Sequence, residues 1–176
     1  HQLADPQVDA EALLATPLHV ASAPGQPLPP TLYGPARRNA RGLDLAKAGE
    51  RAPLLAAVAE ATVPAVAPAD AGAVDATMRR LHAAQPAGAA LPPAARAAVL
   101  ERAADRLEAE LPAWCGLLVR EARKTLGDAL AEVREAVDFC RYYAVQTRET
   151  LGPRVLPGPT GETNTWSAHG RGVFVC

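Results

Sequence analysis

Aromatic residues, cysteines and long apolar runs are all scarce in this chain. Only 4% of its 176 residues are aromatic, so we expect a core of alanine, leucine and valine. The three cysteines, Cys115, Cys140 and Cys176, form no CxxC pair and have no histidine at zinc spacing, which argues against a disulfide framework and a metal site. No apolar run approaches the roughly 20 residues that span a bilayer, and none near the start follows a charged leader. We therefore expect a soluble, cytoplasmic protein.

Neither sign of charge is concentrated in one part of the chain. The 18 basic and 19 acidic residues give a net charge of -1 at pH 7, without a block of one sign. This balance argues against nucleic acid as a partner of this segment. Hydrophobic residues make up 49% of the sequence, which is enough to form one ordinary domain.

Most of the 17 prolines precede residue 94, which predicts short elements and connectors in the first half of the chain. Asp9 is placed to cap a short helix that Pro17 ends. Residues 22–30 carry four prolines and a glycine, and they predict an extended, semi-stiff connector. Residues 50–61 are prone to form a helix, with prolines following it.

Three arginines, Arg37, Arg38 and Arg41, follow a predicted turn at residues 33–35. They are consistent with an anion site or a contact with another domain. The plainer interpretation, which we favour, is solvated or salt-bridged charge. Leu43 and Leu45, which are two positions apart, then form an apolar pair.

Residues 70–85 predict a helix with apolar side chains along one side. These side chains are Val74, Met78 and Leu81. His82 lies beside that side, but the sequence identifies no carboxylate or nucleophile to act with it. We therefore interpret His82 as a histidine of the surface or of the edge of the core.

Three helices are expected to follow in close succession. Pro93 suits the first turn of one helix and Pro112 that of the next, while Thr125 and Asp128 have the spacing of a capping box. The last helix should run to about Leu151. The expected apolar stripes are Leu100, Ala103, Ala104, Leu107 and Leu111 on the first helix, Trp114, Leu117 and Leu118 on the second, and Leu130, Val133, Val137, Cys140 and Ala144 on the third.

The polar side of the third helix is expected to face away from the core. The residues assigned to that side are Asp128, Glu132, Glu135 and Arg141. Arg134 and Asp138 are spaced for an i,i+4 ion pair worth about 0.3 kcal/mol. Cys115 and Cys140 occur on apolar faces, so we interpret both as small hydrophobic residues.

Beyond Leu151 the pattern changes from helical periodicity to turns and short strands. Residues 163–168 predict a strand, residues 169–172 a turn, and residues 173–176 an apolar run suited to a buried strand. The expected fold class is therefore mainly α, with a short β hairpin at the C-terminus. Residues 158–162, GPTGE, lack the strand, loop and helix of a phosphate-binding turn.

Four stretches resemble the aldehyde dehydrogenase half of the proline utilization A (PutA) family of bifunctional enzymes. They are LYGPARRNARGLDLA at 32–46, VREARKTLGDALAEVREAVDFCRYYA at 119–144, LPGPTGETN at 156–164 and HGRGVFVC at 169–176. One departure is Arg123, where the family usually has glycine. If that position requires a positive φ, arginine there is strained.

The resemblance implies that the chain is a piece of a larger enzyme. Residues 1–46 would be a connector from a proline dehydrogenase half, and residues 47–176 the first, incomplete part of a Rossmann-like NAD-binding domain in the α/β aldehyde dehydrogenase fold. The parent would use FAD and NAD to convert L-proline into glutamate. It would act as a homo-oligomeric enzyme with small-molecule substrates, either in the cytoplasm or peripheral at the inner face of the membrane.

The resemblance places no catalytic, cofactor-binding or metal-binding residue in this piece, and the remainder of the same polypeptide would be its partner. Cys176 would close the first sheet strand and would not be the nucleophile. The isolated piece is expected to be inactive and poorly stable. Two alternatives stay open: part of a stand-alone aldehyde dehydrogenase, and a non-enzymatic helical module that docks through Trp114, Leu117 and Leu118.

Overall fold

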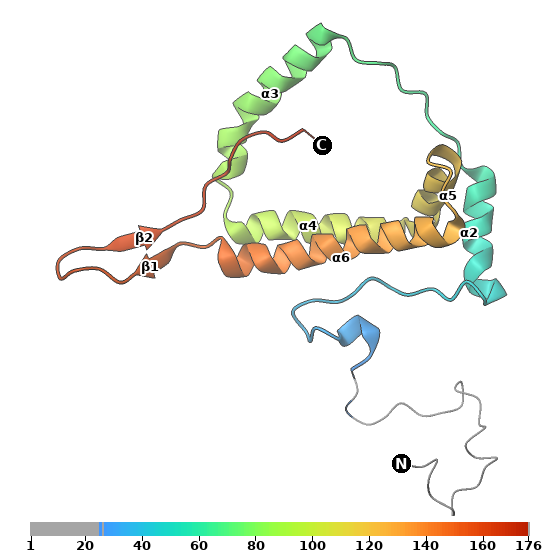
Figure 1. Cartoon of the computed structure of the whole chain (residues 1–176), viewed down its shortest axis with the longest axis horizontal. Coiled ribbons are helices and arrows are strands. Elements are labelled where there is room, and N and C mark those ends of the chain that lie inside the picture. Colours follow the sequence, from blue (N-terminus) through green and yellow to red (C-terminus); the bar gives the residue numbers. More distant parts are fainter. Residues whose placement is uncertain (1–24, 26, 176) are drawn as a thin grey trace, which may run out of the picture.

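The structure is a computed structural model that describes residue 25 and residues 27–175, and it is mainly helical (Figure 1). The helix expected after Asp9 and the position of Cys176 lie outside the described residues. In chain order the elements are the 3-10 turn η3 (Pro29–Thr31), the helices α2 (Ala48–Glu60), α3 (Ala71–Ala89), α4 (Pro93–Ala109), α5 (Leu111–Glu121) and α6 (Leu126–Thr150), and the strands β1 (Arg154–Leu156) and β2 (Asn164–Trp166).

Helices α4 and α6 lie side by side and form the centre of the molecule (Figure 1). The predicted start of α6 is confirmed, because the Asp128 amide donates to Thr125 Oγ1 at 3.2 Å. The Thr125 hydroxyl in turn donates to the Asp128 carboxylate at 2.7 Å, so the two side chains bond to each other at the N-terminus of the helix. The predicted end near Leu151 agrees with the last helical residue, Thr150.

Small residues allow α4 and α6 to pack closely. Ala97 and Ala104 of α4 and Ala144 of α6 are fully buried, as is Val137 at the middle of α6. A second apolar cluster joins α2, α5 and α6, and its buried members are Leu54, Leu111, Cys115, Ala129, Leu130 and Val133. The predicted core of alanine, leucine and valine is confirmed, and Cys115 behaves as the small hydrophobic residue that was expected.

The structure corrects three expectations about α4 and α6. Arg141 is buried rather than solvent-facing, because carboxylates of α4 bind its guanidinium. Arg134 and Asp138 do not form an ion pair among the described residues, and Asp138 accepts a hydrogen bond from the Ala40 amide. Ala103 is exposed, so the apolar stripe of α4 is narrower than expected.

Helix α3 begins where expected and stands apart from the α4–α6 pair (Figure 1). The Asp70 carboxylate caps it by accepting from the Ala73 amide at 2.7 Å. The helix passes through Pro86 and ends four residues beyond the predicted residue 85, at Ala89. Its predicted apolar side chains are exposed in the described part of the chain: Val74, Met78 and Leu81.

The hairpin near the C-terminus is confirmed as an element, and β2 confirms the strand predicted at residues 163–168. Its partner β1, with Arg154 opposite Trp166, was not predicted. Residues 173–175, which were expected to form a buried strand, are not a strand. The chain turns instead after Pro159, where the Glu162 amide bonds to the Pro159 carbonyl and Gly161 has a φ of +93°.

The chain before α2 is only partly the extended connector that was predicted. Pro29 and Pro30 begin the 3-10 turn η3, because proline has the backbone angle that such a turn needs. The Asn39 side chain then donates to the Pro29 carbonyl at 2.9 Å, which holds η3 against the following segment. The turn predicted at residues 33–35 is confirmed, with Gly34 at a φ of +70°. No helix of the described residues is long and apolar enough to cross a membrane.

Candidate functional site

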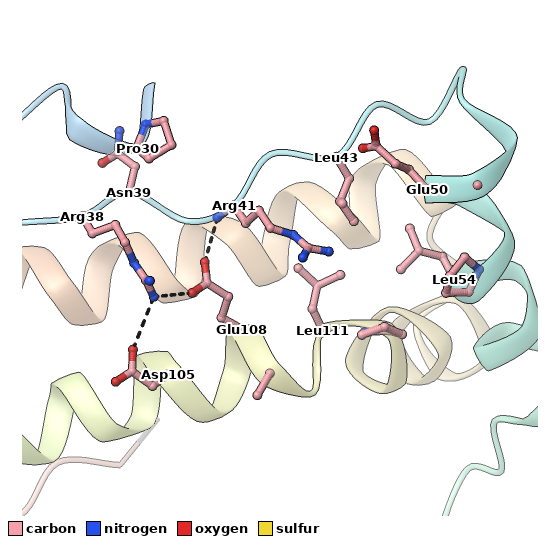
Figure 2. Close-up of a pocket in the computed structure, with 14 residues that line it drawn as sticks. Pro30, Arg38, Asn39, Arg41, Leu43, Glu50, Leu54, Asp105, Glu108 and Leu111 are labelled. Atoms are coloured by element: carbon pink, nitrogen blue, oxygen red, sulfur yellow. Dashed lines mark hydrogen bonds and ion pairs between the residues drawn. The ribbon is translucent and has the colours of Figure 1, made fainter. Parts of the chain in front are cut away.

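The most highly connected polar site lies where residues 38–45, here called the strap, cross helices α4 and α6 (Figure 2). Ala40 is the buried residue of the strap, with 4% of its surface exposed, and it packs with Ala104 of α4 and Val137 of α6. Leu43 and Leu45 pack against the second apolar cluster, beside Leu54. The strap therefore connects the two apolar clusters of the molecule.

Glu108 of α4 is the centre of the polar contacts. Its carboxylate accepts from Arg38 Nη2 at 2.7 Å, from the Arg41 amide at 2.7 Å and from Arg141 Nη2 at 2.8 Å. Asp105, one turn earlier, accepts from Arg141 at 3.0 Å and lies 3.8 Å from Arg38. One carboxylate thus joins the strap, α4 and α6.

The charges of this cluster stabilise one another. Burial opposes ionisation of Glu108, but hydrogen bonds from Arg141 and the Arg41 amide, with the charges of Arg141 and Arg38, leave its pKa below the ordinary value. Burial also opposes the charged form of Arg141, yet the hydrogen bonds that its guanidinium donates to Glu108 and Asp105 raise its pKa. Both groups are therefore charged at neutral pH.

A cavity of about 810 Å³ lies between the strap, the start of α2 and the junction of α4 with α5. Its apolar wall includes Leu43, Leu54 and Leu111, and Figure 2 shows the Arg41 side chain extending across it. The polar groups on the other side, Arg38 and Glu108, already bind each other. The cavity therefore has an apolar floor and an edge at which Arg38 and Glu108 neutralise each other.

The residues that line this cavity do not fit a nucleotide cofactor. A dinucleotide needs unpaired donors for its phosphates and a glycine-rich turn between a strand and a helix. In residues 27–175 the sheet is the β1–β2 hairpin, which no helix follows, and the guanidinium of Arg38 is occupied by Glu108.

Two of the three arginines singled out in the sequence, Arg38 and Arg41, bind Glu108, but their guanidinium groups do not share a partner with that of Arg37. Arg38 is salt-bridged, as the plainer interpretation expected. Arg37 lies over the Tyr33 ring at 3.7 Å and over the Tyr142 ring at 5.4 Å. Arg41 contributes its main-chain amide to Glu108. This arrangement favours a structural contact over an anion site.

The remaining candidate residues take no part in the polar contacts of the strap. His82 is exposed on α3, and Cys140 is half-buried against the cluster of Ala40, Ala104 and Val137. Cys115 is buried, and burial raises the pKa of its thiol, so it is a poor nucleophile. Trp114 and Leu117 line an apolar groove of about 540 Å³ beside α2, whereas Leu118 packs against the second apolar cluster.

Sequence reasoning missed Glu108 and Asp138 as the partners of the strap. Asp138 Oδ1 accepts from the Ala40 amide at 2.6 Å, across 98 residues of sequence. The available signal was the pair of carboxylates at Asp105 and Glu108, one helical turn apart, in a chain with an arginine-rich segment. That signal becomes specific only when the packing of α4 on α6 is known.

Comparison with known proteins agrees with the fold. The aldehyde dehydrogenase family model matches residues 45–176. The bifunctional protein PutA of Rhizobium meliloti is 38% identical over 95% of this chain and 17% of its own length. A crystal structure of a Bradyrhizobium japonicum PutA mutant has a TM-score of 0.79 at 39% identity, covering 97% of this chain and 18% of that one.

A shorter match covers about half of the chain. The 1-pyrroline-5-carboxylate dehydrogenase 2 of Bacillus subtilis is 39% identical over 47% of this chain and 16% of its own length. The chain spans about one sixth of the length of the curated relatives that it matches. Because the family model covers most of the sequence, the chain belongs to the aldehyde dehydrogenase family, and within it the chain is a homologue of the PutA proteins.

Proposed function

We propose that this chain is part of a PutA-type bifunctional enzyme that oxidises L-proline to L-glutamate. In this proposal residues 1–46 are the connector from the proline dehydrogenase half. Residues 47–176 are the first part of the NAD-binding domain of the aldehyde dehydrogenase half.

One observation carries this proposal: the match to PutA extends over nearly the whole chain. It covers 95% of the sequence for the Rhizobium protein, whereas the match to the Bacillus pyrroline-5-carboxylate dehydrogenase covers 47%. Because the Rhizobium match leaves out only 5% of the 176 residues, or about nine, it includes most of the segment before residue 45, which lies outside the aldehyde dehydrogenase family match. A connector from a preceding catalytic unit accounts for that segment, and a stand-alone dehydrogenase does not need one.

The proposed parent reaction has two oxidation steps. In the first, FAD would accept two electrons and two protons from L-proline, and water would open the resulting pyrroline-5-carboxylate to glutamate semialdehyde. In the second, NAD would accept a hydride from the semialdehyde held by a cysteine outside this chain, and hydrolysis would release glutamate. We place none of these reacting groups in residues 1–176.

This chain's own role in the proposal is structural. The α4–α6 pair and α5 form a helical support, and the strap attaches the connector to it through Glu108 and Asp138. The exposed apolar side chains of α3 and residues 173–175 are surfaces that the remainder of the polypeptide would cover. In the isolated chain these apolar side chains would stay in contact with water, and we therefore expect that chain to be poorly stable.

Two assays of the native polypeptide that contains this chain test the proposal. We expect NADH formation from glutamate semialdehyde with NAD, and also from L-proline with NAD and a quinone that reoxidises the flavin. NADH from the semialdehyde alone would instead support a stand-alone aldehyde dehydrogenase. A folded polypeptide with neither activity would support the helical interaction module.

Substitutions within this chain test the absence of catalytic residues. His82→Ala, Cys140→Ala and Cys176→Ser should each leave kcat for the semialdehyde within about twofold of the native value, because none is proposed to contact substrate. A loss of several orders of magnitude in kcat for any of them, with folding retained, would place that residue in the active site.

A further inference from the structure

We propose that the strap is a conformational latch, in which Glu108 and Asp138 act as positioning residues. Together they fix the path of the chain across α4 and α6, and so the point from which the preceding chain leaves this helical pair. The inference goes beyond the proposed function, since it concerns contacts within this chain and holds for whichever enzyme carries it.

Both carboxylates bind the main chain of the strap, and this determines its path. Asp138 accepts from the Ala40 amide at 2.6 Å, and Glu108 accepts from the Arg41 amide at 2.7 Å. Hydrogen bonds from a main-chain amide to a carboxylate are charge-assisted and short, and they fix the backbone rather than a side chain. Because Asp138 is on α6 and Glu108 is on α4, two successive amides are bound by two different helices.

Glu108 is the shared component of the latch. Its carboxylate also binds the Arg38 guanidinium, so it bonds both ends of the 38–41 segment. The third partner, Arg141, keeps a second acceptor in Asp105 at 3.0 Å if Glu108 is lost. Removing Glu108 therefore releases two strap contacts at once while the buried guanidinium of Arg141 remains paired.

Apolar packing holds this end of the strap weakly. Ala40 is its one buried side chain, and the cavity of about 810 Å³ adjoins the strap where it continues towards Leu43. The far end is held differently, by Leu45 on the second apolar cluster and by Arg51 Nη1, which donates to the Leu45 carbonyl at 2.6 Å. Loss of the carboxylate contacts should thus free the residues around Ala40 and leave the Leu45 end in place.

The helices beneath the strap have contacts of their own. Arg148 of α6 donates to both carboxylate oxygens of Glu101 of α4, at 2.5 and 2.7 Å, and Ala97 and Ala144 are fully buried. Glu101 makes no recorded contact with the strap among the residues that the structure describes. It therefore provides a matched control, because it is on the same helix and also pairs with an arginine of α6.

Hydrogen–deuterium exchange of the native polypeptide, followed by mass spectrometry, tests the latch. In Glu108→Ala the Arg41 amide should exchange at least about tenfold faster than in the native protein, because it loses its hydrogen bond to a charged group. The Ala40 amide should also exchange faster, because the strap on either side of it is released from Glu108. The amides of α4 and α6 should keep their native rates. In Glu101→Ala the strap amides should exchange at the native rate.

Asp138 supplies an independent pair of variants. Asp138→Ala should accelerate exchange at Ala40, whereas Asp138→Asn retains an acceptor oxygen and should restore most of the protection. Native protection of the strap in both Glu108→Ala and Asp138→Ala would overturn the proposal. It would also be overturned if α4 and α6 lost protection together with the strap, since the two residues would then support the whole fold. The NADH assays are separate measurements, so failure of the proposed function would not be confused with failure of the latch.

Discussion

Arg123 occupies a backbone conformation that favours glycine. It follows Ala122, the C-terminal cap of α5, and its φ is +58°. Left-handed positions just after a helix are usually glycine, because a Cβ atom there is crowded by the backbone. From the sequence, strain at Arg123 was expected only if this position, usually glycine in the resembling family, has a positive φ. The structure confirms that it does.

Replacing Arg123 by glycine should stabilise the protein. We expect Arg123→Gly to raise the free energy of opening of α5 and α6 by about 1 kcal/mol, measured by native-state hydrogen exchange. Arg120→Gly, three residues earlier and inside α5, is the matched control and should lower it by about 1 kcal/mol. If Arg123→Gly lowers the free energy of opening as much as Arg120→Gly does, then contacts of the Arg123 side chain outweigh its backbone strain, and the prediction is wrong.

Glu108 should make stability depend on pH in the acid range. Its folded pKa lies below the ordinary glutamate value of about 4.3, so the folded state binds fewer protons than the unfolded state between the two pKa values. The stabilisation that ionised Glu108 gives to the folded state is fully present above about pH 4.3 and is lost as the pH falls through its folded pKa.

Urea unfolding between pH 3 and pH 6 measures this contribution. The native protein should lose more stability on acidification than Glu108→Gln, which has no carboxylate to protonate at this position. Glu135→Gln, on an exposed part of α6, should follow the native curve. Parallel pH curves for the native protein and Glu108→Gln would contradict the electrostatic role of Glu108.

At the scale of the elements, α2 packs on α5 at Gly116. A Cβ atom at that position would lie 2.6 Å from the Ala57 carbonyl oxygen and 2.9 Å from its carbon. Both atoms belong to the backbone of α2, which cannot rotate away as a side chain would. The close approach of the two helices therefore requires glycine here.

Gly116→Ala should separate α2 from α5. We expect a loss of about 2 kcal/mol in the free energy of unfolding, because overpacking forces the backbone to shift. Gly127→Ala, in the first turn of α6, has only an ordinary contact at 3.9 Å and should raise stability by about 0.5 kcal/mol. Thermal unfolding of the two variants would measure the difference, and equal midpoints would show that α2 and α5 are not tightly packed.

Elements that depend on local sequence could be predicted, and those that depend on distant partners could not. Helix α6 was located by the Thr125 cap and the spacing of its apolar residues, which are properties of neighbours in sequence. The first strand of the hairpin, β1, was not predicted, and residues 173–175 were wrongly expected to form a strand, because strand pairing depends on turn geometry and on packing elsewhere. Arg141 was placed on the solvent side because the carboxylates that neutralise it belong to another helix, 33 and 36 residues earlier.

At the scale of the whole molecule, the candidate site was predictable only in part. The arginine-rich segment was recognised, and salt bridging was the favoured interpretation, as found for Arg38. The convergence of this segment on Glu108 and Asp138 follows from the packing of α4 against α6, which no local pattern encodes. The resemblance supplied the family because it rests on motifs spread along the chain, and the match over residues 45–176 agrees with it.

The central claim is that this chain acts within a longer bifunctional polypeptide. The most direct test is the intact mass of the native product, isolated from cells that make it with an antibody against α4–α6. The account predicts one polypeptide several times heavier than the 18.3 kDa of this sequence, with bound flavin, because the chain spans about one sixth of its PutA relatives. A native product of about 18.3 kDa without flavin would contradict the account.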